Sequence, residues 1–77
     1  MLRYEVHSSE LRSVGYDASI SLLEVEFQSG EVYQYFNVPA EFVLGLLEAD
    51  SLGRYFNAQI RPKFKFKQVR YHHPAHL

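Results

Sequence analysis

The sequence predicts an α+β domain: a small, mainly antiparallel sheet of three or four strands, covered on one face by two short helices. Three observations lead to this fold class. Apolar and polar residues alternate between residues 11 and 35, apolar residues recur at helical spacing between residues 39 and 60, and alternation returns at residues 63–70. The predicted order is therefore strand, strand, strand, helix, helix, strand.

The 77 residues allow a single domain, 1–77. Its regular pattern covers about residues 7–70, and residues 71–77 are expected to form a flexible tail. The first predicted strand runs from Leu11 to Tyr16, and the polar residues 17–19 then turn the chain. Residues 4–9 carry a weaker pattern, which fits either an extension of this strand or a loop.

A β-hairpin is predicted next, because two alternating runs flank Ser29-Gly30. A two-residue turn at Ser29-Gly30 would pair Phe27 with Val32 and place the following tyrosines on the outer face. A three-residue loop, with Gly30 in the left-handed region, would instead pair Val25 with Tyr33. We prefer the three-residue loop, because it gathers the larger apolar mass on one face of the sheet.

Two short helices should follow the hairpin. Pro39 suits the first position of a helix over residues 39–49, where its missing N–H costs nothing. Asp50 and Ser51 are both good N-caps for a second helix, which should end at Pro62. The apolar residues that should face the core are Phe42, Val43, Leu46 and Leu47 in the first helix, and Leu52, Tyr55, Phe56 and Ile60 in the second.

The charged residues are segregated along the chain. Residues 1–50 hold all nine acidic residues and two arginines, a formal charge of −7, whereas residues 51–77 hold six cations and no acid. This asymmetry is an argument about partners rather than about fold. It makes the C-terminal third the predicted contact surface.

The segment from Arg61 to Arg70 is the main candidate for binding. In an extended chain Arg61, Lys63, Lys65 and Lys67 would share one face, with two phenylalanines on the other. Cations in a row suit the phosphates that dominate nucleic-acid affinity, and exposed rings could stack on unpaired bases. The alternative is an edge strand whose lysines prevent aggregation with other strands, with Phe64 and Phe66 in the core. The candidate nucleic-acid-binding residues are Arg54, Arg61, Lys63, Lys65, Lys67 and Arg70, with Asn57, Phe64 and Phe66 as additional candidates.

Asn57 is a poor helix former in mid-helix, so we expect it either to hydrogen-bond to a neighbouring loop or to share a binding face with Arg54 and Arg61.

Several residues that invite an enzymatic interpretation have simpler ones. His7, Ser8, Ser9 and Asp17 do not form a catalytic triad, since no oxyanion-forming glycine elbow accompanies them. The two serines and Asp17 are better explained as turn and capping residues. Glu24 and Glu26 are expected to form a solvated acidic strip on one strand face. His72, His73 and His76 lie in the predicted tail, interrupted by a proline. We therefore predict no catalytic residue, no metal site and no cofactor.

The chain lacks cysteine, which excludes disulfides and thiolate chemistry and favours an intracellular location. Its N-terminus does not resemble a signal peptide, and no apolar stretch approaches membrane-spanning length. A cytoplasmic location without membrane contact is expected.

A series of short motifs resembles one known family: Ser8-Ser9, Val14-Gly15-Tyr16-Asp17, Leu23-Glu24-Val25-Glu26-Phe27, Gly30, Tyr33-Gln34-Tyr35, Val38-Pro39, Ser51-x-Gly53 and Tyr55-Phe56-Asn57. Together they resemble the KTSC domain, a module at the C-terminus of some lysyl-tRNA synthetases and in free-standing small bacterial and phage-associated proteins. The resemblance covers about residues 7–70. Members usually end in Tyr-x-Tyr followed by basic residues, where this chain has Phe64-Lys65-Phe66, so a role needing those two hydroxyls is not implied here.

Two hypotheses about partners follow. The first is a non-enzymatic module that contacts RNA, tRNA-like or single-stranded, through the basic C-terminal strand; the resemblance to a synthetase module adds an analogy. The second is a protein partner or a homodimer, in which an acidic hairpin carrying Glu24, Glu26 and Glu31 would meet the basic strand of another copy.

Overall fold

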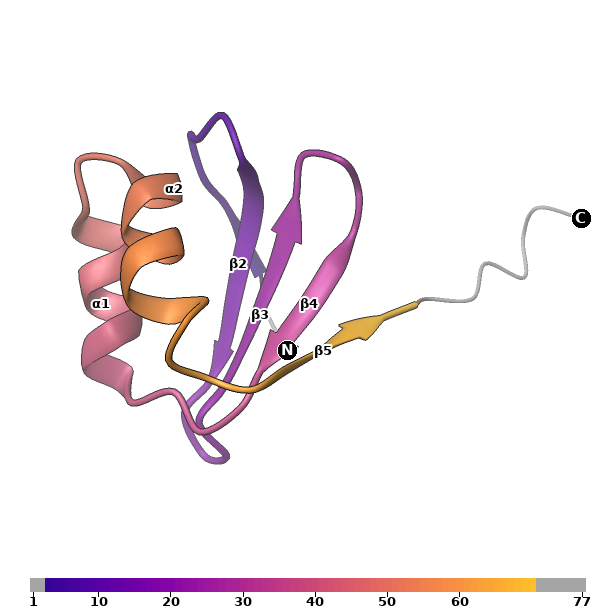
Figure 1. Ribbon diagram of the computed structural model, residues 1–77, viewed down its shortest axis with the longest axis vertical. Helices are drawn as coiled ribbons and strands as arrows, with labels where there is room; N and C mark the ends of the chain where they lie inside the picture. Colours follow the sequence, from indigo (N-terminus) through magenta and orange to yellow (C-terminus); the bar gives the residue numbers. More distant parts are fainter. Residues whose placement is uncertain (1–2, 71–77) are drawn as a thin grey trace, which may run out of the picture.

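The computed structural model describes residues 3–70 and contains a five-stranded antiparallel sheet with a helical layer on one side (Figure 1). The strands lie in the sheet in the order in which they follow one another in the chain, β1-β2-β3-β4-β5. The predicted α+β class and element order are confirmed. The elements are β1 (Arg3–Glu5), β2 (Leu11–Asp17), β3 (Leu22–Phe27), β4 (Val32–Tyr35), α1 (Ala40–Glu48), α2 (Leu52–Tyr55), the π-helical turn η1 (Phe56–Ile60) and β5 (Phe66–Val69).

The sheet has one strand more than predicted. Residues 3–5 form a separate edge strand that pairs with β2, with Tyr4 opposite Val14. All three residues of β1 are exposed, so the strand carries no alternation between buried and exposed positions. That absence explains why the sequence pattern was weak at this end of the chain.

The β3–β4 hairpin has the register that the three-residue loop predicts. Val25 lies opposite Tyr33, and the backbone N–H of Gly30 donates to the carbonyl of Phe27 over 2.9 Å. Gly30 has a φ of 96°, in the region that glycine occupies without a steric penalty. Tyr35 is consequently buried, with only 2% of its surface exposed, and Tyr33 is half-buried on the same face.

The substitution Gly30→Ala should lower the free energy of unfolding by about 1–2 kcal/mol, because an L-residue is penalised at this φ. An added Cβ would meet nothing within 4 Å, so the cost is confined to the backbone. Urea unfolding of the two proteins measures the difference. Gly30→Asn is the matched control and should lose less, since asparagine tolerates the left-handed region. Equal stability of the alanine variant and the native chain would contradict the assigned loop.

α1 covers the sheet through a narrower stripe than predicted. Pro39 is the N-cap residue of α1, and the helix begins one residue later than expected. Val43 and Leu46 are buried, and Phe42 packs against the core. Leu47 was predicted to face the core, and this was wrong: 46% of its surface is exposed. The buried positions are spaced three apart, so the next residue along the chain turns toward solvent.

The second helical segment changes its hydrogen-bonding pattern halfway. Ser51 is the N-cap of α2, and its hydroxyl accepts a hydrogen bond from the Arg54 N–H over 3.3 Å. From Phe56 the helix widens into a π turn, in which the Arg61 N–H donates to the Phe56 carbonyl over 2.9 Å. The wider turn changes which side chains share a face. Arg61 stands over the Phe56 ring.

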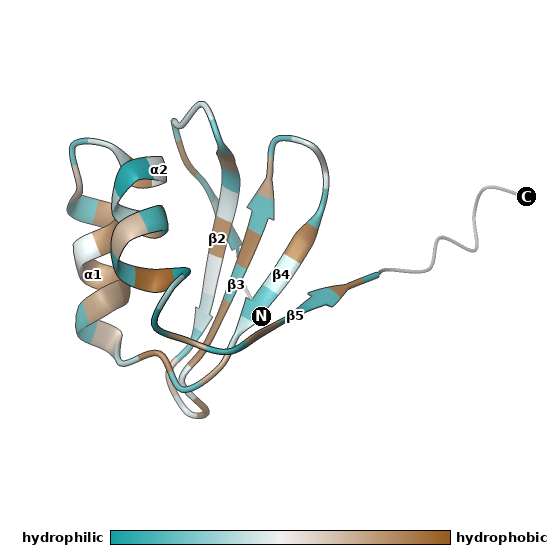
Figure 2. Ribbon diagram, in the orientation of Figure 1, coloured by the Kyte–Doolittle hydropathy of each residue, from teal (hydrophilic) through white to brown (hydrophobic). Residues whose placement is uncertain are grey.

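The core lies between the sheet and the helices. Figure 2 shows apolar residues on the helices and along the central strands. Phe56 and Ile60 are fully buried, as predicted, and so is Leu23 in the central strand β3. In residues 3–70 we find no helix with the length and apolar character that crossing a membrane would require. The predicted tail, residues 71–77, lies outside the described part of the chain.

Candidate functional site

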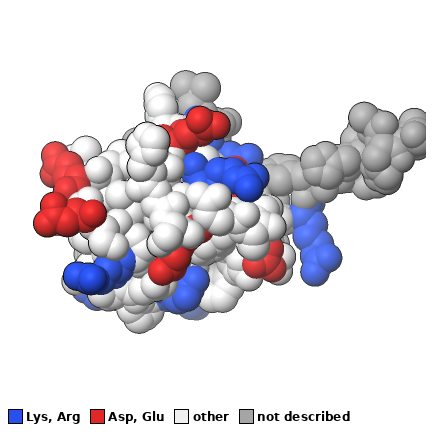
Figure 3. All heavy atoms as spheres, turned by 90° about the horizontal axis from the view of Figure 1, so that it is seen from above, with Lys and Arg blue, Asp and Glu red and all other residues white. Residues whose placement is uncertain are grey.

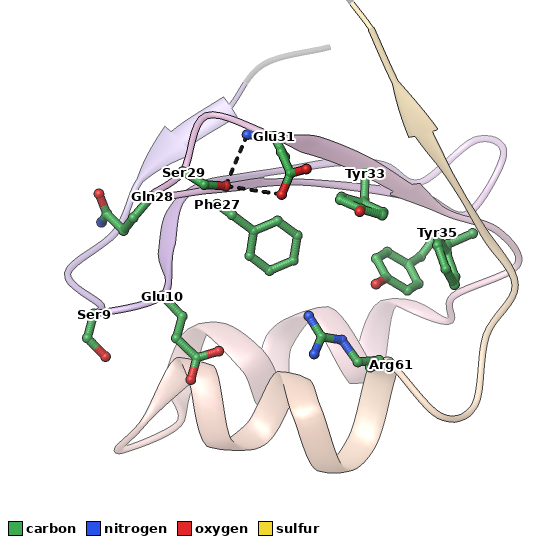
Figure 4. Close-up of a pocket in the computed structure, with 10 residues that line it drawn as sticks. Ser9, Glu10, Phe27, Gln28, Ser29, Glu31, Tyr33, Tyr35 and Arg61 are labelled. Carbon is green, nitrogen blue, oxygen red and sulfur yellow. Dashed lines mark hydrogen bonds between the residues drawn. The ribbon is translucent and has the colours of Figure 1, made fainter.

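An open pocket lies between the tip of the β3–β4 hairpin, the end of η1 and β5 (Figure 4). Its volume of ≈ 470 Å³ falls within the range of small-molecule and cofactor sites. Four separate parts of the chain, the β3–β4 hairpin among them, supply the walls, which is why sequence spacing gave no sign of the pocket. The lining residues are Ser9, Glu10, Phe27, Gln28, Ser29, Glu31, Tyr33, Tyr35, Arg61 and Phe66.

One end of the pocket is aromatic. Phe66 on β5 lies opposite Tyr35 in the sheet register, and their ring centroids are 5.4 Å apart. The Phe66 ring is also 5.4 Å from that of Tyr33, which makes an edge-to-face contact with Phe27. Although it rests on these rings, Phe66 keeps 52% of its surface exposed. The core position considered for Phe66 is therefore wrong, whereas Phe64 is half-buried against Phe42.

Arg61 forms a cationic wall of the same pocket. Its guanidinium carbon lies 5.3 Å from the centroid of the Phe56 ring and 5.8 Å from that of Phe27. These are the distances of cation–π contacts. Within residues 3–70, no carboxylate lies at salt-bridge distance from Arg61. The side chain is exposed, so the N–H donors that it does not direct at the Tyr35 phenol can reach a ligand.

Tyr35 belongs to the buried core and also lines this pocket. Burial raises the pKa of its phenol, and the neighbouring Arg61 guanidinium opposes that shift by favouring the ionised form. The net direction is upward, so the hydroxyl stays protonated near neutral pH. The pocket therefore carries its positive charge on Arg61 without a compensating phenolate.

The other end of the pocket is acidic. The Asn57 side-chain amide donates a hydrogen bond to Glu10 Oε2 over 3.2 Å, which ties the β1–β2 loop to the helical layer. This confirms the expected hydrogen bond between Asn57 and a neighbouring loop. The alternative, a binding face shared by Asn57, Arg54 and Arg61, stays a prediction; of these three residues, Arg61 lines this pocket. Arg54 lines a different surface pocket, together with Asp50.

The basic residues do not form the single row that an extended chain would give. Residues 61–64 form a turn, and β5 begins only at Phe66. Lys63 donates to the Gln59 side chain over 2.9 Å and lies over the Phe42 ring, away from the pocket. Lys65, Lys67 and Arg70 remain exposed along or directly beside β5. Lys67 pairs with Gln34 on the sheet face opposite Phe66.

The acidic residues of the hairpin are engaged within the chain. Glu24 is only 5% exposed and forms a salt bridge with Arg3, with an N–O distance of 3.3 Å. Ser13 donates to Glu26 over 2.9 Å, and Arg12 lies 3.7 Å from the same carboxylate. The predicted solvated strip at Glu24 and Glu26 is therefore wrong. Figure 3 shows acidic and basic residues interspersed on the face that it displays.

Ser8 and Asp17, two of the residues set aside as turn and capping residues, have those roles. The Ser8 hydroxyl accepts hydrogen bonds from the N–H groups of Glu10 and Leu11, over 3.1 and 3.2 Å. Asp17 accepts from the Ser19 backbone and side chain, and these bonds lower the pKa of its carboxyl. His72, His73 and His76 lie outside the described residues.

Comparisons with known proteins agree on one family. The family model of the KTSC domain matches residues 7–64. An uncharacterized protein of Stutzerimonas stutzeri is 56% identical over 63 residues, which cover 82% of this chain and 89% of that protein. A lysine–tRNA ligase of Nostoc punctiforme is 41% identical over 61 residues, or 79% of this chain and 11% of the ligase. The crystal structure of a KTSC domain protein from Yersinia pestis superposes with a TM-score of 0.87 at 35% identity, covering 90% of this chain and 97% of that one.

Proposed function

This chain belongs to the KTSC domain family, and we propose that it is a small non-enzymatic module that binds single-stranded RNA along β5. One observation carries the proposal. Phe66 presents a half-exposed ring to the pocket, while Lys65 and Lys67 stand on either side of it in the sequence with their side chains exposed. This is the combination of stacking ring and backbone cations that proteins use on unpaired nucleic acid.

The two lysines suit phosphate contacts. Within residues 3–70, neither Lys65 nor Lys67 lies at salt-bridge distance from a carboxylate. Arg70 follows β5 directly and extends the same exposed edge. Because β5 is the last strand of the described sheet, its outer edge has no strand partner among these residues and is open to an extended ligand. The relatives named lysine–tRNA ligase agree with an RNA partner by analogy.

The double variant Lys65→Ala/Lys67→Ala tests the phosphate contacts. We expect weaker binding to a labelled single-stranded RNA, and a plot of log affinity against log salt that is flatter by about 1.4, since each phosphate contact on a single strand contributes about 0.7. Fluorescence anisotropy at several salt concentrations gives both quantities. The cytoplasmic location and the lack of enzymatic activity belong to the same proposal.

Lys63→Ala is the matched control for that titration. It removes the same charge from a residue that lies over Phe42 and bonds to Gln59, so affinity and salt slope should stay close to those of the native chain. Absence of RNA binding by the native protein at low salt would overturn the proposed function. Self-association is not adopted as the function, because Glu24 and Glu26 already form salt bridges with Arg3 and Arg12 of the same chain.

A further inference from the structure

We infer that the pocket recognises a guanine base, with Arg61 on one side of the base and Glu10 on the other. This inference rests on the proposed function and specifies which unpaired base the RNA-binding surface selects. It draws on the aromatic wall of the pocket, on the placement of its two charged groups and on the contacts that fix Glu10.

A flat ring is the ligand shape that the aromatic end fits. The exposed Phe66 ring lies 5.4 Å from each of the Tyr33 and Tyr35 rings. The Phe27 ring, 5.4 Å from that of Tyr33, continues this surface into the space between Arg61 and Glu10 (Figure 4). Any base can stack on such a surface, so stacking alone selects no sequence. Selection must come from the polar groups at the edge of the ring.

The two charged groups frame the pocket from opposite sides. Figure 4 shows Arg61 and Glu10 on either side of the Phe27 ring, with both side chains extending into the space between sheet and helix. Arg61 offers only hydrogen-bond donors, and an ionised Glu10 offers only acceptors. A ligand that lies between them must therefore present acceptors along one edge and donors along another.

Guanine has that arrangement of groups. Its O6 and N7 are adjacent acceptors that suit a guanidinium. Its N1–H and N2–H₂ are adjacent donors that suit a carboxylate. Adenine and cytosine each place an acceptor beside their amino group, where it would face a carboxylate oxygen, and uracil has one donor between two acceptors. Guanine is thus the base whose two edges match both groups.

Glu10 is held in place before any ligand binds. Asn57 donates to its Oε2 over 3.2 Å, and Gly53 beneath it leaves room that a side chain would fill, since an added Cβ would lie 3.0 Å from Glu10 Oε1. A carboxylate has lone pairs left after one hydrogen bond, so it can still accept from the base. The carboxylate of Glu31, the other acid of the pocket, accepts a hydrogen bond from Ser29 of its own turn over 3.2 Å and is tied to no other segment of the described chain. Glu10 is therefore the group fixed well enough to distinguish bases.

The same acidic end prevents a phosphate from entering the pocket. Glu10 and Glu31 both line it and would repel the RNA backbone. The backbone is then left to Lys65, directly before β5, and to Lys67, on the face of β5 opposite Phe66, both at the open edge of the described sheet. Only the uncharged base can enter between sheet and helix.

The test compares labelled uridine nonamers that carry a single central guanosine, inosine, adenosine or uridine. These have the same length and charge, so their phosphate contacts are matched. The guanosine nonamer should bind about tenfold more tightly than the adenosine and uridine nonamers, as a good bidentate pair would give. Inosine lacks the 2-amino group and should lose most of this preference. Glu10→Gln should abolish it, while Glu31→Gln, which removes the same charge from the same pocket, should retain it.

The outcomes separate this inference from the proposed function. Equal, salt-sensitive affinity for all four nonamers would overturn guanine recognition and leave the RNA-binding proposal standing. A preference that survives in Glu10→Gln would overturn the role of Glu10. Failure of every nonamer to bind would overturn both proposals. Because Glu10 is exposed, Glu10→Gln should fold, and circular dichroism checks this.

Discussion

Replacing Phe56 with alanine should lower the free energy of unfolding by about 3–5 kcal/mol. Phe56 is fully buried, and its ring makes edge-to-face contacts with Phe27 and Tyr35 at centroid distances of 5.6 and 5.3 Å. The lost ring would leave a cavity where the helical layer meets the sheet. A 77-residue domain has a total stability of about 4–12 kcal/mol, so this loss would leave a substantial unfolded fraction.

Urea unfolding monitored by circular dichroism measures this change. Phe66→Ala is the matched control, because it removes the same ring from a position that is 52% exposed and should destabilise the protein much less. Similar losses in the two variants would show that burial is not what distinguishes the rings. That result would contradict the core described here.

Phe66→Ala, which should affect stability little, should instead weaken RNA binding, with a loss of about 1–3 kcal/mol in binding free energy. The substitution removes the exposed ring that borders the pocket and lies between Lys65 and Lys67, while both lysines remain. The salt slope should therefore stay close to that of the native protein, because no phosphate contact is lost. Anisotropy titrations at several salt concentrations distinguish loss of stacking from loss of charge.

Phe66→Tyr is the conservative control for that experiment. It retains the aromatic face and adds a hydroxyl at an exposed position, so affinity should be close to native. Unchanged affinity in Phe66→Ala would contradict stacking on this ring. The RNA would then contact the protein through its phosphates alone.

The local parts of the fold followed from the sequence because they depend on neighbouring residues. The position of Gly30 fixed the hairpin loop and hence the pairing of Val25 with Tyr33. The Ser51 hydroxyl caps the helix that starts beside it. In each case the deciding interaction lies within a few residues of the chain, which is the distance over which turn and capping preferences act.

Most of the candidate site could not be predicted from the sequence, because it depends on contacts between segments that are far apart in the chain. Nothing in residues 56–61 signalled the π turn, yet this turn decides that Arg61 faces the pocket. Glu24 looked solvated in an alternating strand, but Arg3 on the unpredicted β1 pairs with it across the sheet. Of the six predicted basic residues, only Arg61 lines the pocket. Glu10 became a candidate binding residue only because the structure shows its hydrogen bond with Asn57 and its close approach to Gly53.

The order of the strands also has a consequence for how the protein folds. β1, β2 and β3 each pair with the next strand across a short connection, whereas β5 reaches β4 only after α1, α2 and η1 have intervened. Closing that longer loop costs more chain entropy, so β5 should dock after the hairpins have formed. It can also detach without breaking any other strand pair in the described sheet. A ligand that contacts both β5 and the pocket would therefore hold this last-docked strand against the rest of the sheet. Its binding energy would stabilise the paired position of β5 over the detached one.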